Sequence, residues 1–231
     1  MLVLATATPR EMKAVLAGFG ERATVEQGSP VPLELRGRSV LLVVTGVGVV
    51  NAALAAGMLL AREDVDGVVN LGVAGAFDPE THPLGSAHAA ECEIWPEYGL
   101  LMPDGTIDPK GIGFAQARLD SGPVWDRVAL DPEGDARRMG LRLSEAWGRG
   151  ASLTVSCVSG TSERAAGLGR KYGAALENME GFGLAYACAV RGVPFLEVRT
   201  VSNVVGSRRE EDWALKRALA ALGPCAHALI T

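Results

Sequence analysis

The chain has 231 residues, 48% of them hydrophobic, which is enough to bury a large core, and we expect one domain over residues 1–231. Its net charge is −5, and Lys and Arg are scattered apart from two short arginine pairs, which argues against a nucleic-acid surface. No apolar stretch approaches the roughly 20 residues that span a bilayer, and the N-terminus has no basic leader. The sequence therefore predicts a cytoplasmic protein whose partners include neither a membrane nor a nucleic acid.

Hydrophobic patterns and turn residues predict strands that alternate with helices. In chain order, we expect a strand at 2–7, a helix at 9–19, strands at 31–35 and 39–45, a helix at 49–61, strands at 65–77 and 86–94, a helix at 131–148, a strand at 151–158, helices at 161–172 and 179–190, a strand at 194–201 and a helix at 210–230. The rest of the Pro- and Gly-rich region 79–130 is expected to form loops and short edge strands. This alternation predicts the α/β class, with a largely parallel sheet covered by helices on both faces.

Four cysteines are spread along the chain, at Cys92, Cys157, Cys188 and Cys225. They show neither the CxxC spacing nor the neighbouring His pair of a zinc site, so we expect no metal. Most of them stand in apolar runs, which favours four buried thiols in a reducing compartment.

Ligands of parallel sheets bind at the carboxyl ends of the strands. The loops after Ala7, Thr45, Leu71, Val158 and Val201 therefore mark the expected site. They place one set of residues around a single opening: Glu11, Gly46–Gly48, Gly72–Gly75, Ser159–Thr161 and Ser202–Asn203.

Taken singly, the motifs near these strand ends also have ordinary structural explanations. The TGVG turn with Gly46 and Gly48 lacks the third glycine of a dinucleotide fingerprint, so it marks either a tight turn or a ligand contact. The small residues of NLGVAGAF, among them Ala74 and Gly75, let the backbone approach a ligand closely. An acid such as Glu180 is favourable in the first turn of a helix, and a polar residue such as Asn203 often serves a turn.

Together, five segments resemble the nucleoside phosphorylase and nucleosidase superfamily: ATATPREM, TGVGVVNAA, NLGVAGAF, ENMEGFGLAYA and VPFLEVRTVSNVVGSR. Within it, TPRE and SNVVGSR make the chain most similar to the futalosine hydrolases, which act in the futalosine route to menaquinone. The resemblance implies a three-layer fold with a central mixed, mostly parallel sheet flanked by helices. It also implies a small-molecule nucleoside substrate, no cofactor, and a homodimer or a larger homo-oligomer.

The resemblance assigns roles to two acids. In the superfamily, the glutamate of the MEG motif, here Glu180, binds the ribose 2′- and 3′-hydroxyls, and the preceding methionine, here Met179, packs against the sugar. A carboxylate suits this task because charge-assisted hydrogen bonds are strong. In hydrolytic members an N-terminal glutamate activates the attacking water, and Glu11 matches it, although a helix acid of the first turn is the alternative explanation.

Two asparagines bear on the reaction and on the leaving base. Phosphorylases of the superfamily carry a phosphate-binding arginine where this chain has Asn70, so the resemblance favours hydrolysis. Adenine-releasing members carry an aspartate where this chain has Asn203, whose amide donors suit O6 and N7 of hypoxanthine. Ser202 and Arg199 are expected to orient Asn203, with a structural ion pair as the equal alternative for Arg199.

Some alternatives stay open at the level of the sequence. The carboxylate arm of futalosine needs a donor, which Arg208, Arg209 or backbone amides can supply, unless both arginines are simply solvated. The alternative functions are a methylthioadenosine/S-adenosylhomocysteine or aminofutalosine nucleosidase, a purine nucleoside phosphorylase, and a purine-binding sensor without catalysis.

Overall fold

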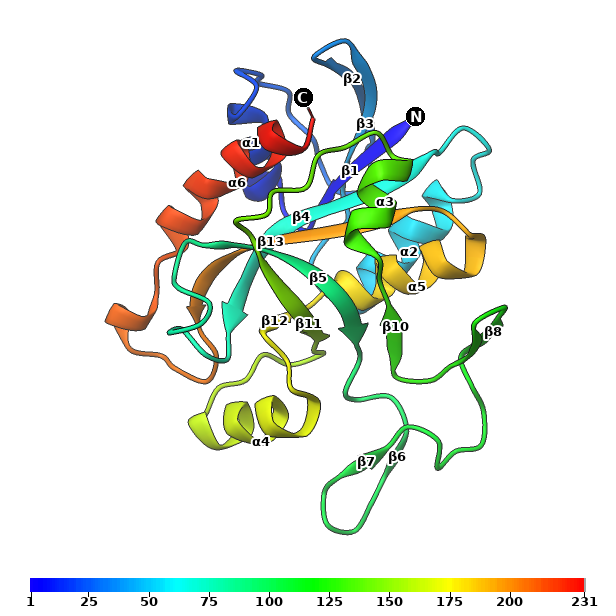
Figure 1. The fold of residues 1–231 in the computed structure, drawn as a ribbon, viewed down its shortest axis with the longest axis vertical. Coiled ribbons are helices and arrows are strands. Elements are labelled where there is room, and N and C mark those ends of the chain that lie inside the picture. The colour runs from blue at the N-terminus through cyan, green and yellow to red at the C-terminus, as the bar shows by residue number, and fades with distance from the viewer. Residues whose placement is uncertain (231) are drawn as a thin grey trace.

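A nine-stranded mixed sheet forms the middle of the computed structural model, which describes residues 1–230 (Figure 1). Its strands are β1 (Leu2–Thr6), β2 (Val31–Leu35), β3 (Arg38–Val44), β4 (Gly67–Ala76), β5 (Ala87–Ile94), β10 (Arg127–Ala129), β11 (Gly148–Thr154), β12 (Leu176–Asn178) and β13 (Phe195–Val204). The order is β10-β5-β11-β12-β4-β1-β3-β2, and β13 pairs with both β4 and β5. The pairs β1–β3, β1–β4, β4–β13, β5–β11 and β11–β12 are parallel, so the predicted mixed, mostly parallel sheet is confirmed.

Helices cover both faces of this sheet, which gives the molecule three layers. On one face α1 (Pro9–Ala17) lies beside α6 (Leu215–Leu229), and on the other α2 (Val49–Leu59) lies beside α5 (Gly181–Arg191) (Figure 1). Alternate residues of β1 serve the two faces: Leu2 and Leu4 pack with α1 and α6, whereas Val3 and Ala5 pack with α2 and α5. The two remaining α-helices are α3 (Pro132–Arg138) and α4 (Ser162–Tyr172).

Small elements extend from this framework at one end. The hairpins β6 (Leu100–Leu101) with β7 (Ile107–Asp108) and β8 (Ala117–Leu119) with β9 (Gly122–Val124) belong to the region expected to form loops and short edge strands (Figure 1). The 3₁₀ helix η1 (Glu210–Asp212) precedes α6. No helix within residues 1–230 combines the length and the apolar character needed to cross a membrane.

The structure corrects several expectations about elements. The helix expected at 131–148 ends at Arg138, because the chain turns at Gly140, whose φ of 63° is left-handed, and β11 already begins at Gly148. The helix expected at 210–230 is two elements, since η1 stops at Asp212 and α6 begins at Leu215. The three-residue strand β12 was not expected at all.

The expectation of four buried cysteines is also wrong in part. Cys188 and Cys225 are buried, but Cys92 is only partly buried and Cys157 is exposed. Cys157 follows the end of β11 at Thr154, in a loop that the predicted strand at 151–158 had placed inside the sheet. All four thiols are free.

Candidate active site

A cleft of about 250 Å³ opens near the carboxyl ends of β1, β4, β12 and β13. Glu11, Met179, Glu180, Ser202 and Asn203 all line it, so residues far apart in the sequence meet at one opening. Ala74 and Gly75, the two small residues of β4 that were expected next to a ligand, also line the cleft. The structure therefore brings these expected residues together around one cavity at the strand ends.

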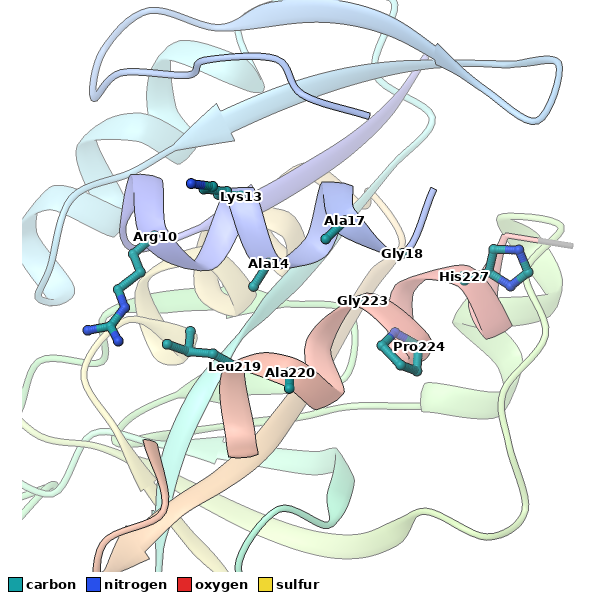
Figure 2. A pocket seen from close by; sticks show the side chains of 10 residues that line it. All are labelled: Arg10, Lys13, Ala14, Ala17, Gly18, Leu219, Ala220, Gly223, Pro224 and His227. Carbon is teal, nitrogen blue, oxygen red and sulfur yellow. The ribbon is translucent and has the colours of Figure 1, made fainter. Parts of the chain in front are cut away.

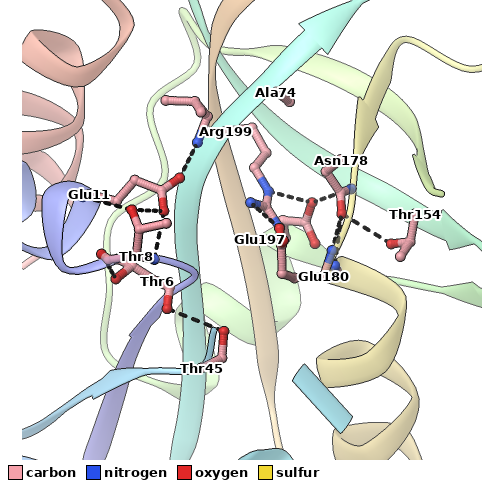
Figure 3. Close-up of polar contacts among 12 residues, drawn as sticks. Thr6, Thr8, Glu11, Thr45, Ala74, Thr154, Asn178, Glu180, Glu197 and Arg199 are labelled. Carbon is pink, nitrogen blue, oxygen red and sulfur yellow. Dashed lines mark hydrogen bonds and ion pairs between the residues drawn. The ribbon is translucent and has the colours of Figure 1, made fainter. Parts of the chain in front are cut away.

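Glu11 is both a helix cap and a wall of the cleft. Thr8 caps α1, and Pro9 begins the helix, so Glu11 stands at the third position and completes a capping box with Thr8. Glu11 Oε2 accepts hydrogen bonds from Thr8 N at 2.9 Å and Thr8 Oγ at 2.8 Å, and Oε1 accepts one from Val73 N at 3.0 Å (Figure 3). The two explanations of Glu11 offered by the sequence are thus compatible, because the capping bonds fix the carboxylate where it faces the cleft.

Glu180 stands at the junction between β12 and α5. Asn178 Oδ1 accepts from the backbone N–H groups of Glu180 at 2.9 Å and Gly181 at 2.8 Å, which caps the helix and sets the direction of the Glu180 side chain (Figure 3). Glu180 Oε1 accepts from Gly48 N at 3.0 Å, where Gly48 has a left-handed φ of 98°. Burial raises the pKa of Glu180, while the Arg199 charge opposes this rise.

Arg199 is fully buried and lies among acids, which is the ion-pair arrangement that the sequence left open beside a role in orienting Asn203. Its Nε donates to Glu197 Oε1 at 3.0 Å, and its NH1 group lies 3.4 Å from Glu180 Oε2 (Figure 3). No hydrogen bond joins it to Asn203 in the described chain, so the ion-pair alternative holds.

Ser202 is the residue that contacts the Asn203 amide. Ser202 Oγ donates to Asn203 Oδ1 at 2.8 Å and also lies 3.1 Å from Ala74 O, and Asn203 Nδ2 donates to Val204 O at 3.2 Å. A Cβ at Gly75 would lie only 2.9 Å from Asn203 Nδ2, so a glycine on β4 leaves room for this amide. The hydroxyl contact directs the amide oxygen toward Ser202 and leaves the NH₂ group on the other side.

Other expected residues lie outside the lining of the cleft. Gly46 packs against the side chain of Gln27, and Gly48 contributes through its bond to Glu180. Asn70 is buried in β4, and its Nδ2 has no hydrogen-bond partner among residues 1–230. Thr161 caps α4.

The lining also includes Ser159 and Arg208, which the sequence had suggested, together with Glu177 and Trp213, to which it had assigned no role. Ser159 donates from N and Oγ to the Glu177 carboxylate at 2.9 and 2.6 Å, which joins the loop after β11 to β12 on one wall. On another wall, Arg208 and Trp213 come from the segment between β13 and α6. The acidic ENMEG segment pointed to Glu177, but nothing in the sequence pointed to Trp213.

A larger hollow of about 710 Å³ lies elsewhere, between α1 and α6 (Figure 2). The helices approach closely there because Gly18 meets Gly223, and the surroundings are small or apolar side chains together with Arg10, Lys13 and His227 (Figure 2). This hollow has no carboxylate in its lining, so the smaller cleft at the strand ends holds the groups that can perform acid–base chemistry.

Comparison with known sequences gives consistent matches along the chain. A family model described as "Phosphorylase superfamily" matches residues 2–231. The futalosine hydrolase of Thermus thermophilus is 37% identical over 85% of this chain and 83% of its own length, and that of Streptomyces coelicolor is 36% identical over 96% and 91%. A 5′-methylthioadenosine/S-adenosylhomocysteine nucleosidase of Colwellia psychrerythraea is 29% identical over 75% and 70%.

Solved structures share the fold at low sequence identity. The native futalosine hydrolase of Helicobacter pylori superposes with a TM-score of 0.72 at 15% identity, over 97% of this chain and 93% of that chain. The 5′-methylthioadenosine/S-adenosylhomocysteine nucleosidase of the same organism, bound to butyl-thio-DADMe-Immucillin-A, gives 0.73 at 16% identity over 97% and 94%. The predicted three-layer fold is confirmed.

Proposed function

The chain belongs to the phosphorylase superfamily, and from that premise we propose that it is a nucleosidase that hydrolyses the N-glycosidic bond of futalosine. The observation that carries the proposal is the meeting of Glu11, Glu180 and Asn203 around one cleft. The relatives of 36–37% identity, both named futalosine hydrolase, support the substrate over the more distant nucleosidases. The enzyme acts in the cytoplasm, in the futalosine route to menaquinone.

The sugar is held by Glu180 and Met179. The Glu180 carboxylate accepts the two hydrogen bonds of the ribose 2′- and 3′-hydroxyls, and Met179 packs against the ring. As the glycosidic bond breaks, the sugar becomes cationic, so a buried negative charge beside it stabilises the transition state more than the bound substrate. Arg199 limits the rise of the Glu180 pKa that burial causes, which favours the charged form of the carboxylate.

Glu11 activates the water that attacks the anomeric carbon. Its carboxylate accepts a proton from this water, a contribution worth about 10²- to 10⁴-fold in rate. The contacts with Thr8 and Val73 hold the carboxylate in place before the substrate arrives, which lowers the cost of organising the site.

Asn203 selects the leaving base. With its oxygen accepting from Ser202 and one N–H donating to Val204 O, the second N–H of its NH₂ group is available to the 6-oxo group or to N7 of a purine, both of which are acceptors. The products are therefore hypoxanthine and dehypoxanthine futalosine. An adenine-releasing reaction would place the 6-amino group against another donor, which disfavours methylthioadenosine and aminofutalosine as substrates.

The enzyme forms a homodimer or a larger homo-oligomer. Behind the glycine turn at Gly48, the outer side of α2 presents Val50, Leu54 and Met58, whose exposed fractions are 78%, 63% and 65%. A stripe of large apolar side chains at helical spacing is typical of a surface that another chain covers.

The proposal is tested by incubating the purified protein with futalosine, methylthioadenosine and inosine, each with and without phosphate, and measuring the free base. We expect hypoxanthine from futalosine at a rate that does not depend on phosphate. Glu11→Gln should lower kcat by at least about 100-fold while the melting temperature shows that the variant is folded. Release that requires phosphate would identify a phosphorylase, faster release from methylthioadenosine the other nucleosidase class, and binding without release a sensor.

A further inference from the structure

Behind the cleft, four strands bring together a buried group of polar side chains. Asn178 Nδ2 donates to Glu93 Oε1 at 2.7 Å and to Ser152 Oγ at 2.8 Å, and it lies 3.3 Å from Glu197 Oε1, so one amide contacts both carboxyl groups. Thr154 Oγ lies 2.6 Å from Glu93 Oε2. Arg199 Nε donates to Glu197, as Figure 3 shows. These residues come from β5, β11, β12 and β13, and none of them except Asn178 lines the cleft.

Glu93 and Glu197 approach each other beside Gly181, the first residue of α5. A Cβ at position 181 would lie 2.3 Å from Glu93 Oε1 and 2.2 Å from Glu197 Oε2. Both side chains are fully buried, and Glu197 Oε2 has no hydrogen-bond partner among the described residues. A buried carboxylate oxygen without a donor is costly, and adjacent buried carboxylates repel each other. A proton between the two groups removes both costs.

The charges around the group also favour a bound proton. Arg199 forms ion pairs with Glu180 and Glu197, and a Cβ at Gly72 would touch both Arg199 NH1 and Glu11 Oε1, at 2.5 and 3.0 Å. The Arg199 guanidinium therefore lies near Glu180, Glu197 and Glu11, and Glu93 is a fourth acid in the same group. The pKa of Glu93 is raised well above its usual value of 4.5, first by burial and then by the charge of Glu197.

We propose that Glu93 and Glu197 share one proton, carried by Glu93, and that the remaining Glu197 carboxylate positions Arg199 beside Glu180. The ion pair from Arg199 Nε stabilises the charge on Glu197, whereas the other contacts of Glu93 are the neutral Thr154 hydroxyl and Asn178 amide. Glu93 then donates its proton to Glu197 Oε2, the oxygen that otherwise has no partner.

This arrangement gives Glu197 an indirect role in binding ribose, and that part of the inference rests on the proposed function. Glu180 Oε1 is held by Gly48 N, and Glu180 Oε2 faces Arg199. The direction of the Glu180 carboxylate thus depends on Arg199, and the direction of Arg199 depends on the charge of Glu197. Glu197 is a positioning residue, because it acts through Arg199.

The first test compares Glu197→Gln with Glu93→Gln on futalosine and on its 2′-deoxy analogue. Glu197→Gln removes the charge that holds Arg199, and should lower kcat/KM for futalosine about 10- to 100-fold, with a smaller loss for the analogue. Glu93→Gln supplies an NH₂ donor in place of the proton and should lower kcat/KM at most about threefold on either substrate. Equal losses on both substrates in Glu197→Gln, or a loss in Glu93→Gln as large as in Glu197→Gln, would overturn the proposal.

The second test detects the proton through stability. A group whose pKa is raised by folding stabilises the protein fully below its ordinary pKa, and this stability is lost as the pH rises toward the raised value. The charged groups near Glu93 are Glu197 and Arg199, both on β13. The other neighbours of Glu93 are uncharged: Thr154 on β11, Asn178 on β12 and Gly181 on α5. The melting temperature of the wild type should therefore fall from about pH 5 upward more steeply than that of Glu93→Gln.

Controls keep the two proposals separate. Glu34→Gln makes the same change at an exposed position on β2 and should keep the wild-type slope. If Glu93→Gln shows no cooperative unfolding, infrared spectra of the wild type at neutral pH decide, because a shared proton requires a carboxylic acid C=O band. An absent band, or equal slopes in wild type and Glu93→Gln, contradicts the shared proton. A wild type that releases no base from futalosine contradicts the proposed function, and the stability and infrared results still stand.

Discussion

At Asn203, the difference between one nitrogen atom and one oxygen atom distinguishes purines with a 6-oxo group from purines with a 6-amino group. An amide and a carboxylate have the same shape, but only the amide offers an NH₂ group to the 6-oxo oxygen. In the structure the amide oxygen accepts from Ser202 and one N–H donates to Val204 O, which leaves the second N–H for the base. A carboxylate at this position would instead accept from a 6-amino group.

We therefore expect Asn203→Asp to shift the ratio of kcat/KM for aminofutalosine to that for futalosine upward by at least about tenfold. The measurement is base release from each substrate under identical conditions. Ser202→Ala serves as the companion variant, because it frees the Asn203 amide to rotate and should lower the selectivity for the 6-oxo base without reversing it. A ratio that is the same in wild type and Asn203→Asp excludes Asn203 from base selection.

At the level of elements, the sequence predicted long, strongly patterned segments well and short ones poorly. β4 and α5 are correct within a few residues, because their apolar runs are bounded by glycine turns and polar caps. β12 has three residues and forms only because β11 and β4 flank it, so no local pattern indicates it. The helix predicted at 131–148 was too long, because the apolar residues after Arg138, such as Leu141, reach the core from a segment that is not helical.

The same distinction applies to the site. Glu11, Glu180 and Asn203 follow from motifs at strand and helix ends. The pair of Glu197 and Arg199 was also accessible, since residues two apart in a strand share a face. The position of Glu93 next to Glu197 was not accessible from the sequence, because it depends on how β5 lies relative to β13 and α5.

The segment between β13 and α6 explains how two neighbouring arginines differ. Arg209 binds Asp212 at 2.9 Å and lies near Glu211, whereas Arg208 lies over the Trp213 ring at 5.8 Å and lines the cleft. Arg208 has no ion-pair partner within residues 1–230, so its charge is free to bind the carboxylate arm of futalosine.

We expect Arg208→Gln to raise KM for futalosine about tenfold or more and to leave turnover of inosine, which has no such arm, at its wild-type level. Arg209→Gln is the matched control and should change KM for futalosine little. Steady-state kinetics of both variants on both nucleosides provide the measurement. An equal rise of KM for inosine would assign Arg208 to the structure of the loop and not to the carboxylate.

For the whole molecule, the exposed stripe of Val50, Leu54 and Met58 on α2 is a feature that a folded monomer leaves unexplained. It lies on the side of α2 away from Ala52 and Ala56, which pack into the core.

Leu54→Glu places a charge in the middle of this stripe, which would be buried without a partner in an assembled interface. We expect this variant to be monomeric at concentrations at which the wild type is a dimer or larger, as measured by analytical ultracentrifugation. Ala220→Glu, on α6 at the opposite face of the sheet, makes a comparable change and should keep the wild-type mass. A wild type that sediments as a monomer, or a Leu54→Glu variant with the wild-type mass, would show that copies of the chain do not meet through α2.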